Sequence, residues 1–134
     1  MNEIIDFLYA NPLGYLGTVD EEGRPHVRPW EFMLALDGKL WFWTDNTKDV
    51  FNELQCNPAV EFCSTSMESV SLRLKGDVIF GIDMNIKKKM FERSRELQAR
   101  YKVPKNPEFE IFYLKHGQAM MVNGGGDLIK EIIF

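Results

Sequence analysis

The stretch that decides the fold is residues 24–48, which read Arg-Pro-His-Val-Arg-Pro-Trp-Glu-Phe-Met-Leu-Ala-Leu-Asp-Gly-Lys-Leu-Trp-Phe-Trp-Thr-Asp-Asn-Thr-Lys. Two apolar, aromatic-rich runs flank the dipeptide Asp37-Gly38, which is a strong signal for a β-hairpin. We expect a long strand over 26–36 and a return strand over 39–44. A helix over 47–56, capped by Asn46 or Thr47, should follow directly.

The end of this hairpin carries short polar residues closed by a cation, from Thr44 to Lys48. At a helix start the backbone N–H groups are unpaired and the helix dipole favours anions, and the lysine adds a full positive charge. The neighbouring tryptophans can stack on a flat ring. The segment therefore predicts a seat for a phosphorylated aromatic cofactor.

The rest of the chain is mostly strands. Beyond the hairpin we expect strands over 13–19, 59–64, 69–80, 109–122 and 127–134, with Gly76 at a bend or bulge, and helices over 3–10 (capped by Asn2) and 83–101. Gly14 and Gly17 permit close approach of the backbone. Strands joined by tight turns favour a mainly β (α+β) antiparallel barrel with a few covering helices over a parallel sheet. Neither a Rossmann nor a P-loop glycine motif is present.

The length, charge and composition of the chain limit the kinds of partner that the protein can have. The 134 residues predict a single domain over 1–134, and the net charge of −4 argues against nucleic acid as a partner. No apolar run is long enough to span a membrane, and the start of the chain lacks a signal-peptide pattern, so we expect a cytoplasmic protein. The spacing of the two cysteines and two histidines favours free thiols and argues against a metal site.

The order of these elements resembles the FMN-binding split-barrel family, the superfamily of pyridoxamine 5′-phosphate oxidase. The resemblance rests on Leu-Gly-Thr-Val-Asp (16–20), Gly-Arg-Pro-His-Val-Arg-Pro (23–29), Asp-Gly-Lys-Leu-Trp-Phe-Trp-Thr (37–44), Asn-Pro-Ala-Val-Glu-Phe (57–62) and Leu-Arg-Leu-Lys-Gly (72–76). The segment 106–114 and the short chain look most like the small members grouped with nitroimidazole-resistance (Nim) proteins. The resemblance implies an antiparallel Greek-key split barrel that forms a homodimer with FMN at its interface.

The resemblance also implies a set of cofactor-binding residues. The strand at Arg28, Pro29, Trp30, Glu31 and Phe32 would line the flavin ring. The ribityl chain and phosphate would be held by Trp43, Thr44, Asn46 and Lys48, and Ser71 would reach the flavin edge.

Ordinary structural roles remain open for several of these residues. Lys48 could be a solvated helix lysine, and Arg28 could lie on a solvated strand face or pair with a carboxylate such as Glu31. Trp41 and Trp43 share a strand face and fit the barrel core, whereas Trp30 is the better wall for a cofactor.

The implied function is an oxidoreductase that passes electrons from a reduced nicotinamide to a small acceptor such as a quinone or a nitro compound. The alternatives are a flavin or haem carrier without turnover, and a deazaflavin-dependent reductase on the same fold. None of the side chains is identified as a required acid or base.

Overall fold

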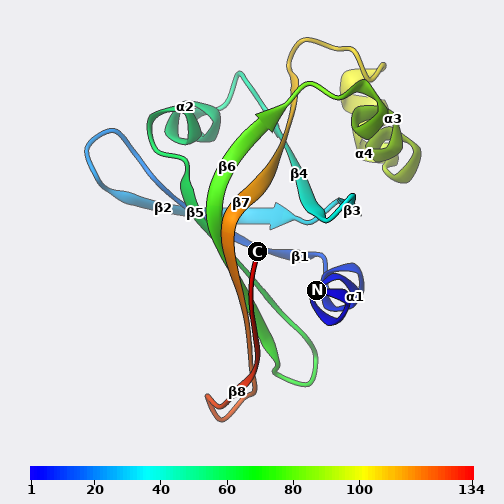
Figure 1. The fold of residues 1–134 in the computed structure, drawn as a ribbon. Coiled ribbons are helices and arrows are strands. Elements are labelled where there is room, and N and C mark those ends of the chain that lie inside the picture. Colours follow the sequence, from blue (N-terminus) through cyan, green and yellow to red (C-terminus); the bar gives the residue numbers. More distant parts are fainter.

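The computed structural model describes residues 1–134, and its elements are shown in Figure 1. In chain order they are α1 (Asn2–Ala10), β1 (Leu13–Val19), β2 (Pro25–Glu31), β3 (Leu34–Leu36), β4 (Lys39–Asp45), α2 (Asp49–Cys56), β5 (Ala59–Thr65), β6 (Ser71–Gly81), α3 (Met84–Arg93), α4 (Arg95–Tyr101), β7 (Phe109–Val122) and β8 (Leu128–Ile133).

The eight strands form one antiparallel sheet in the order β2-β1-β5-β6-β7-β4-β3, with β8 also paired to β7. The first part of β7 pairs with β4, and its last part pairs with β8. The long strands β6 and β7 run through the middle of the molecule, and the helices lie around the sheet (Figure 1). The predicted mainly β, antiparallel fold with a few covering helices is confirmed.

The hairpin between β3 and β4 is also confirmed. Asp37 and Gly38 both have positive φ, at 54° and 72°, as a two-residue hairpin turn with the twist of its strands requires. At Gly76 the pairing of β6 with β7 shifts register between Lys75 and Asp77, so the predicted bulge is present as well.

The predicted long strand over 26–36 is wrong, because the strand is interrupted at Phe32 and Met33, between β2 and β3. The segment before the break, β2, pairs with β1, whereas β3 pairs with β4 at the other end of the strand order. The backbone N–H of Phe32 donates to the carbonyl of Pro12, and that of Met33 donates to the carbonyl of Trp41. The two side chains are buried in different hydrophobic clusters, which is the physical reason for the break.

The helices differ from the prediction at their starts. Asn2 is the first residue of α1 and does not cap it, and α2 begins at Asp49 with Lys48 at its N-cap position. The predicted single helix over 83–101 is divided at Ser94, whose hydroxyl accepts a hydrogen bond from the N–H of Leu97 and so begins a second helix.

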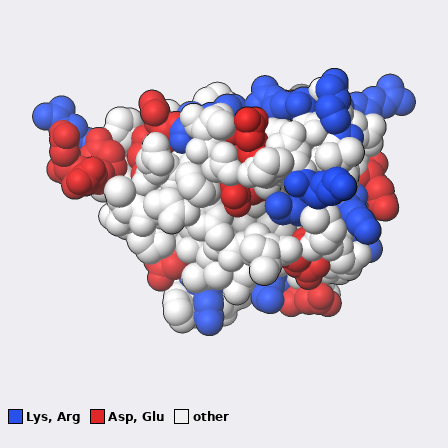
Figure 2. Space-filling view, turned by 90° about the horizontal axis from the view of Figure 1, so that it is seen from above, with Lys and Arg blue, Asp and Glu red and all other residues white.

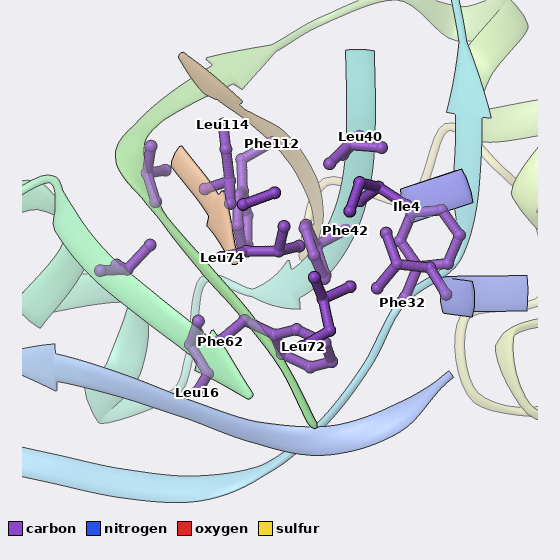
Figure 3. Close-up of a cluster of buried hydrophobic side chains, with 14 of the residues drawn as sticks. Ile4, Leu16, Phe32, Leu40, Phe42, Phe62, Leu72, Leu74, Phe112 and Leu114 are labelled. Carbon is purple, nitrogen blue, oxygen red and sulfur yellow. The ribbon is translucent and has the colours of Figure 1, made fainter. Parts of the chain in front are cut away.

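The core consists of two clusters. The larger one has 16 buried residues, and its aromatic centre is Phe42, whose ring lies 5.4 Å from that of Phe62 and 5.6 Å from that of Phe112. Figure 3 shows side chains from several strands converging on this centre. The second cluster has 10 buried residues and packs α3 and α4 against β4 and β7. The two clusters hold β4 in place from both of its faces.

The glycines of β1 allow a test of this packing. A Cβ on Gly14 would collide with the backbone carbonyl of Cys63 and lie 2.8 Å from the ring of Phe62, whereas a Cβ on Gly17 would meet nothing closer than 3.5 Å. Gly14→Ala should therefore lower the free energy of unfolding by about 1–3 kcal/mol, and Gly17→Ala should change it by less than about 0.5 kcal/mol. Urea unfolding of both variants measures the difference, and equal effects would contradict the close approach of β1 and β5 at Gly14.

A buried hydrogen bond joins α4 to the end of β4. The hydroxyl of Tyr101 donates to Asp45 Oδ2 at 2.6 Å, and both residues are almost fully buried. Burial and the bond to Asp45 raise the pKa of Tyr101 far above its usual value, so the phenol stays protonated. For Asp45, burial alone would raise the pKa, but hydrogen bonds from Thr47 and Tyr101 and the charge of Lys48 together lower it below 3.8.

We expect Tyr101→Phe to lower the free energy of unfolding at pH 7 by about 1.5–3 kcal/mol, because it removes a hydrogen bond to a charged group. The lowered pKa means that the contribution of Asp45 is fully present above its unfolded value of 3.8 and is lost as the pH falls through the folded value. The difference between variant and parent should therefore shrink on acidification. Urea unfolding at pH 7 and at about pH 3 checks this, and a difference independent of pH would contradict a charged Asp45.

Candidate cofactor site

One cleft, with a volume of about 510 Å³, gathers the end of the predicted hairpin and the start of α2. One wall comes from β1 and β2, and the other comes from β4, the N-cap of α2 and α4. Its lining residues are Leu13, Gly14, Tyr15, Pro29, Trp30, Glu31, Trp43, Thr44, Asp45, Lys48, Glu96 and Arg100. Six of the ten predicted cofactor-binding residues line it, namely Pro29, Trp30, Glu31, Trp43, Thr44 and Lys48.

Lys48 lies at the N-cap position of α2, where its ammonium forms neither an ion pair nor a hydrogen bond with the protein. Its backbone N–H donates to the carbonyl of Asp45 at 3.1 Å, which closes the turn between β4 and the helix. No side chain caps α2. An unpaired cation therefore sits beside the first, uncapped turn of a helix, and both favour an anionic ligand.

Two buried polar groups beside the cleft lack a partner. The hydroxyl of Thr44 is buried in a residue that is 2% exposed and has no hydrogen-bond partner. The indole N–H of Trp30 is likewise buried and unpaired. Because buried polar groups are nearly always satisfied, each is a ready partner for a bound molecule. The residues present thus fit a phosphorylated aromatic cofactor, with donors and a cation at one end and aromatic side chains beside them.

Asn46 and Thr47 have structural roles at this turn and do not cap the helix. The amide of Asn46 donates to the carbonyl of Pro107 at 2.6 Å and to Glu110 at 3.2 Å, and Asn46 does not line the cleft. The hydroxyl of Thr47 donates to Asp45 Oδ1 at 2.6 Å. The predicted caps are therefore wrong, because both side chains are already engaged outside the first turn of α2.

Arg28 also lies outside the cleft lining. Its guanidinium forms an ion pair with Glu53 of α2 at 2.8 Å and does not pair with Glu31. Three positions apart on a strand, Arg28 and Glu31 point to opposite faces of the sheet, which accounts for the difference. Arg28 instead faces the interior side, on which α2 packs.

Phe32 and Ser71 complete the set of predicted residues that the structure does not bring to the cleft. Phe32 is 2% exposed and packs in the larger core cluster, with its ring 5.7 Å from that of Phe42. Ser71 begins β6, where it pairs with Thr65 of β5 and Val122 of β7.

The cleft contains residues that the sequence reasoning missed, above all Glu96 and Arg100 of α4. They form a pair at 4.0 Å across one helical turn, and the guanidinium of Arg100 lies 5.9 Å from the ring centre of Trp43. Burial, and then repulsion from Glu96, raises the pKa of Glu31. The i,i+4 spacing of Glu96 and Arg100 places them on one helix face, but nothing local in the sequence indicates what that face covers.

Charge over the rest of the molecule is mixed. Figure 2 looks down on the upper end of the molecule in Figure 1 and shows basic side chains gathered along one side, acidic ones elsewhere, and uncharged surface between them. No broad field of one sign covers this end of the molecule, so any attraction of an anion to Lys48 would be local. No cluster of His, Cys, Asp and Glu side chains could hold a metal ion, and none of the helices is long and apolar enough to cross a membrane.

Comparison with known proteins gives the family. Residues 1–122 match the family model described as pyridoxamine 5′-phosphate oxidase. No curated protein matches the chain. Among solved structures, a NimC/NimA family protein from Clostridium acetobutylicum superposes with a TM-score of 0.88 at 25% identity, covering 100% of this chain and 92% of that one.

Two further structures share the fold. A pyridoxamine 5′-phosphate oxidase-related, FMN-binding protein from Nostoc punctiforme has a TM-score of 0.71 at 17% identity, covering 99% of this chain and 95% of that one. A heme-binding protein from Mycobacterium smegmatis has a TM-score of 0.74 at 15% identity, covering 93% of this chain and 54% of that one. Because the family model matches residues 1–122 of the 134 and the fold is shared throughout, the chain belongs to the pyridoxamine 5′-phosphate oxidase family of split barrels.

Proposed function

We propose that this protein binds FMN in the cleft between β2 and α2 and acts as a small oxidoreductase. The observation that carries the proposal is the segment from Thr44 to Lys48, which offers an unpaired buried hydroxyl and an unpaired ammonium at an uncapped helix start. The cleft volume of about 510 Å³ lies within the range typical of cofactor sites.

Each wall would have a distinct task. Lys48 and the start of α2 bind the phosphate, and Thr44 contributes a hydrogen bond to the polar chain. Trp30, Pro29 and Trp43 offer flat or rigid surfaces to the ring. When bound, the flavin supplies the redox chemistry, taking electrons from a reduced nicotinamide and passing them to a small acceptor such as a quinone or a nitro compound. The side chains bind and orient it and limit its contact with water.

A homodimer is part of this proposal. Leu13, Tyr15 and Val27 are 71%, 58% and 70% exposed, and they share the outward face of β1 and β2. Tyr15 pairs with Pro29 and Leu13 pairs with Glu31, so this apolar face adjoins the cleft. A second copy would cover it and complete the wall of the cofactor site. The two free cysteines accord with a cytoplasmic location, which we also propose.

The alternative is a flavin or haem carrier, and the heme-binding neighbour is the observation that favours haem. The donor set of the cleft favours FMN instead. It includes no histidine, cysteine or methionine, and Tyr15 is its only common axial ligand for haem iron. Both histidines line a separate groove. Titration of the apoprotein with FMN and with haemin decides between them, and saturable binding of haemin alone would overturn the proposal.

The phosphate seat is tested by Lys48→Met. Loss of a charged hydrogen bond should weaken FMN by about 1.5–3 kcal/mol, hence about tenfold or more in Kd. Riboflavin, which lacks the phosphate, should bind parent and variant almost equally. Lys88→Met is the matched control, because Lys88 is an exposed lysine of α3 outside the cleft. Equal FMN affinity for the parent and Lys48→Met would place the phosphate elsewhere.

We expect the reduction of the bound flavin by the nicotinamide donor to limit the rate of turnover. No dinucleotide-binding loop is present, and a net charge of −4 does not attract a phosphorylated donor. We expect NADH or NADPH to reduce the bound flavin slowly and with a high Michaelis constant, because little binding energy positions the donor. Anaerobic stopped-flow absorbance measures the bleaching. If dithionite bleaches the flavin and neither nucleotide does, the protein is a carrier.

A further inference from the structure

The charged side chains that line the cleft fall into two groups. Asp45 and Lys48 lie in the turn that leads into α2, and hydrogen bonds satisfy both oxygens of Asp45. The second group consists of Glu31 of β2 and of Glu96 and Arg100 of α4. It carries two carboxylates and one guanidinium, so one negative charge is in excess at neutral pH.

The two carboxylates of the second group repel each other. Burial is the larger cause of the raised pKa of Glu31, and the negative charge of Glu96 is the second cause. Arg100 offsets only part of this repulsion, because its guanidinium pairs with Glu96 alone, at 4.0 Å. A cation bound beside the two carboxylates would relieve the repulsion, and an anion bound there would be repelled by both.

Aromatic surface beside these charges suits a flat molecule. Trp30 directly precedes Glu31 on β2, and the guanidinium of Arg100 lies 5.9 Å from the ring centre of Trp43. The rings of Trp43 and Tyr101 pack edge to face at 5.8 Å, which holds Trp43 beside α4. Because aromatic faces attract cations, the tryptophans and the carboxylates favour the same class of ligand. That class is planar and carries either no charge or a positive charge.

Binding of FMN as proposed leaves the excess of negative charge in place. The phosphate would take Lys48, which is the only lining cation outside an ion pair. Arg100 would remain paired with Glu96, and the phosphate itself adds negative charge. An acceptor that approaches the bound ring would therefore meet a cleft whose net charge is negative.

We infer that Glu31 and Glu96 select the electron acceptor by charge, so that the cleft takes uncharged or cationic aromatic molecules and rejects anionic ones. The inference rests on the proposed FMN site and names the class of its substrate. Glu96 acts through its charge and transfers no proton. Because its side chain is 62% exposed, water and salt screen its charge, and the selection amounts to a few fold.

The test uses three naphthoquinones, which carry a trimethylammonium group, no charged group or a sulfonate group. The FMN-loaded protein is reduced with dithionite and mixed with each quinone by anaerobic stopped-flow. Each quinone takes two electrons and two protons and becomes a hydroquinone while the flavin is oxidised. Because the quinones differ in reduction potential, the quantity compared is the ratio of the rate constants of variant and parent for each quinone.

Glu96→Gln should speed the reaction with the sulfonate quinone by about two- to fivefold and slow the reaction with the ammonium quinone by a similar factor. The uncharged quinone should change by less than about twofold. The ratios should approach one in about 0.5 M salt, because salt screens exposed charges. Glu92→Gln is the matched control and should leave the ratios near one, because Glu92 is an exposed glutamate of α3 outside the cleft.

A second readout needs no cofactor. In the apoprotein, Glu96→Gln should lower the pKa of Glu31, measured from its side-chain carbon-13 shift during a pH titration, and Glu92→Gln should not. Equal ratios for the three quinones, or an unchanged pKa of Glu31, overturn the inference. Glu31→Gln should give the same order of ratios if Glu96→Gln does not fold. Failure of the parent to bind FMN refutes the proposed function itself, whereas FMN binding with equal ratios refutes only this inference.

Discussion

Asp45 is the residue on which the geometry of the cleft depends. It ends β4, and its carboxylate accepts hydrogen bonds from the backbone and hydroxyl of Thr47 and from the buried hydroxyl of Tyr101. Its carbonyl accepts the N–H of Lys48. A single buried carboxylate thus sets the turn that leads into α2 and also attaches α4 to the sheet. The charge is tolerated because each of its oxygens is hydrogen-bonded.

The two walls of the cleft differ in the chemical groups that they carry. The wall that includes β4 and α2 carries the cation and the unpaired hydroxyl of Thr44, which suit an anion. The acidic side chains Glu31 and Glu96 lie on β2 and α4, where their repulsion is partly balanced by Arg100. Binding, orientation and charge are therefore supplied by separate elements, each attached to the sheet by its own buried contacts.

Much of the fold can be predicted from local sequence patterns. The predictions that are wrong concern features that tertiary packing decides. The strands β1 and β7 have the predicted bounds, and Asp37-Gly38 forms the predicted turn, because period-two alternation and left-handed turn residues act over a few positions. Phe32 and Met33 favour a strand as strongly as their neighbours do, so the break between them is decided only by the two cores that bury them.

The same distinction holds for the site. The run from Thr44 to Lys48 is local, and its position next to Trp43 can be read directly from the sequence. The contribution of α4 depends instead on packing between residues that are far apart in the chain, such as Tyr101 and Asp45, which are 56 positions apart.

The most direct test of FMN binding in the cleft between β2 and α2 is a ¹⁵N–¹H correlation spectrum recorded with and without FMN. We expect FMN to shift the signals of the Trp30 indole N–H and of the amides around Thr44 and Lys48, and to leave the indole N–H of Trp41 unchanged. Shifts confined to Trp41, or to the separate groove lined by the histidines, would contradict it.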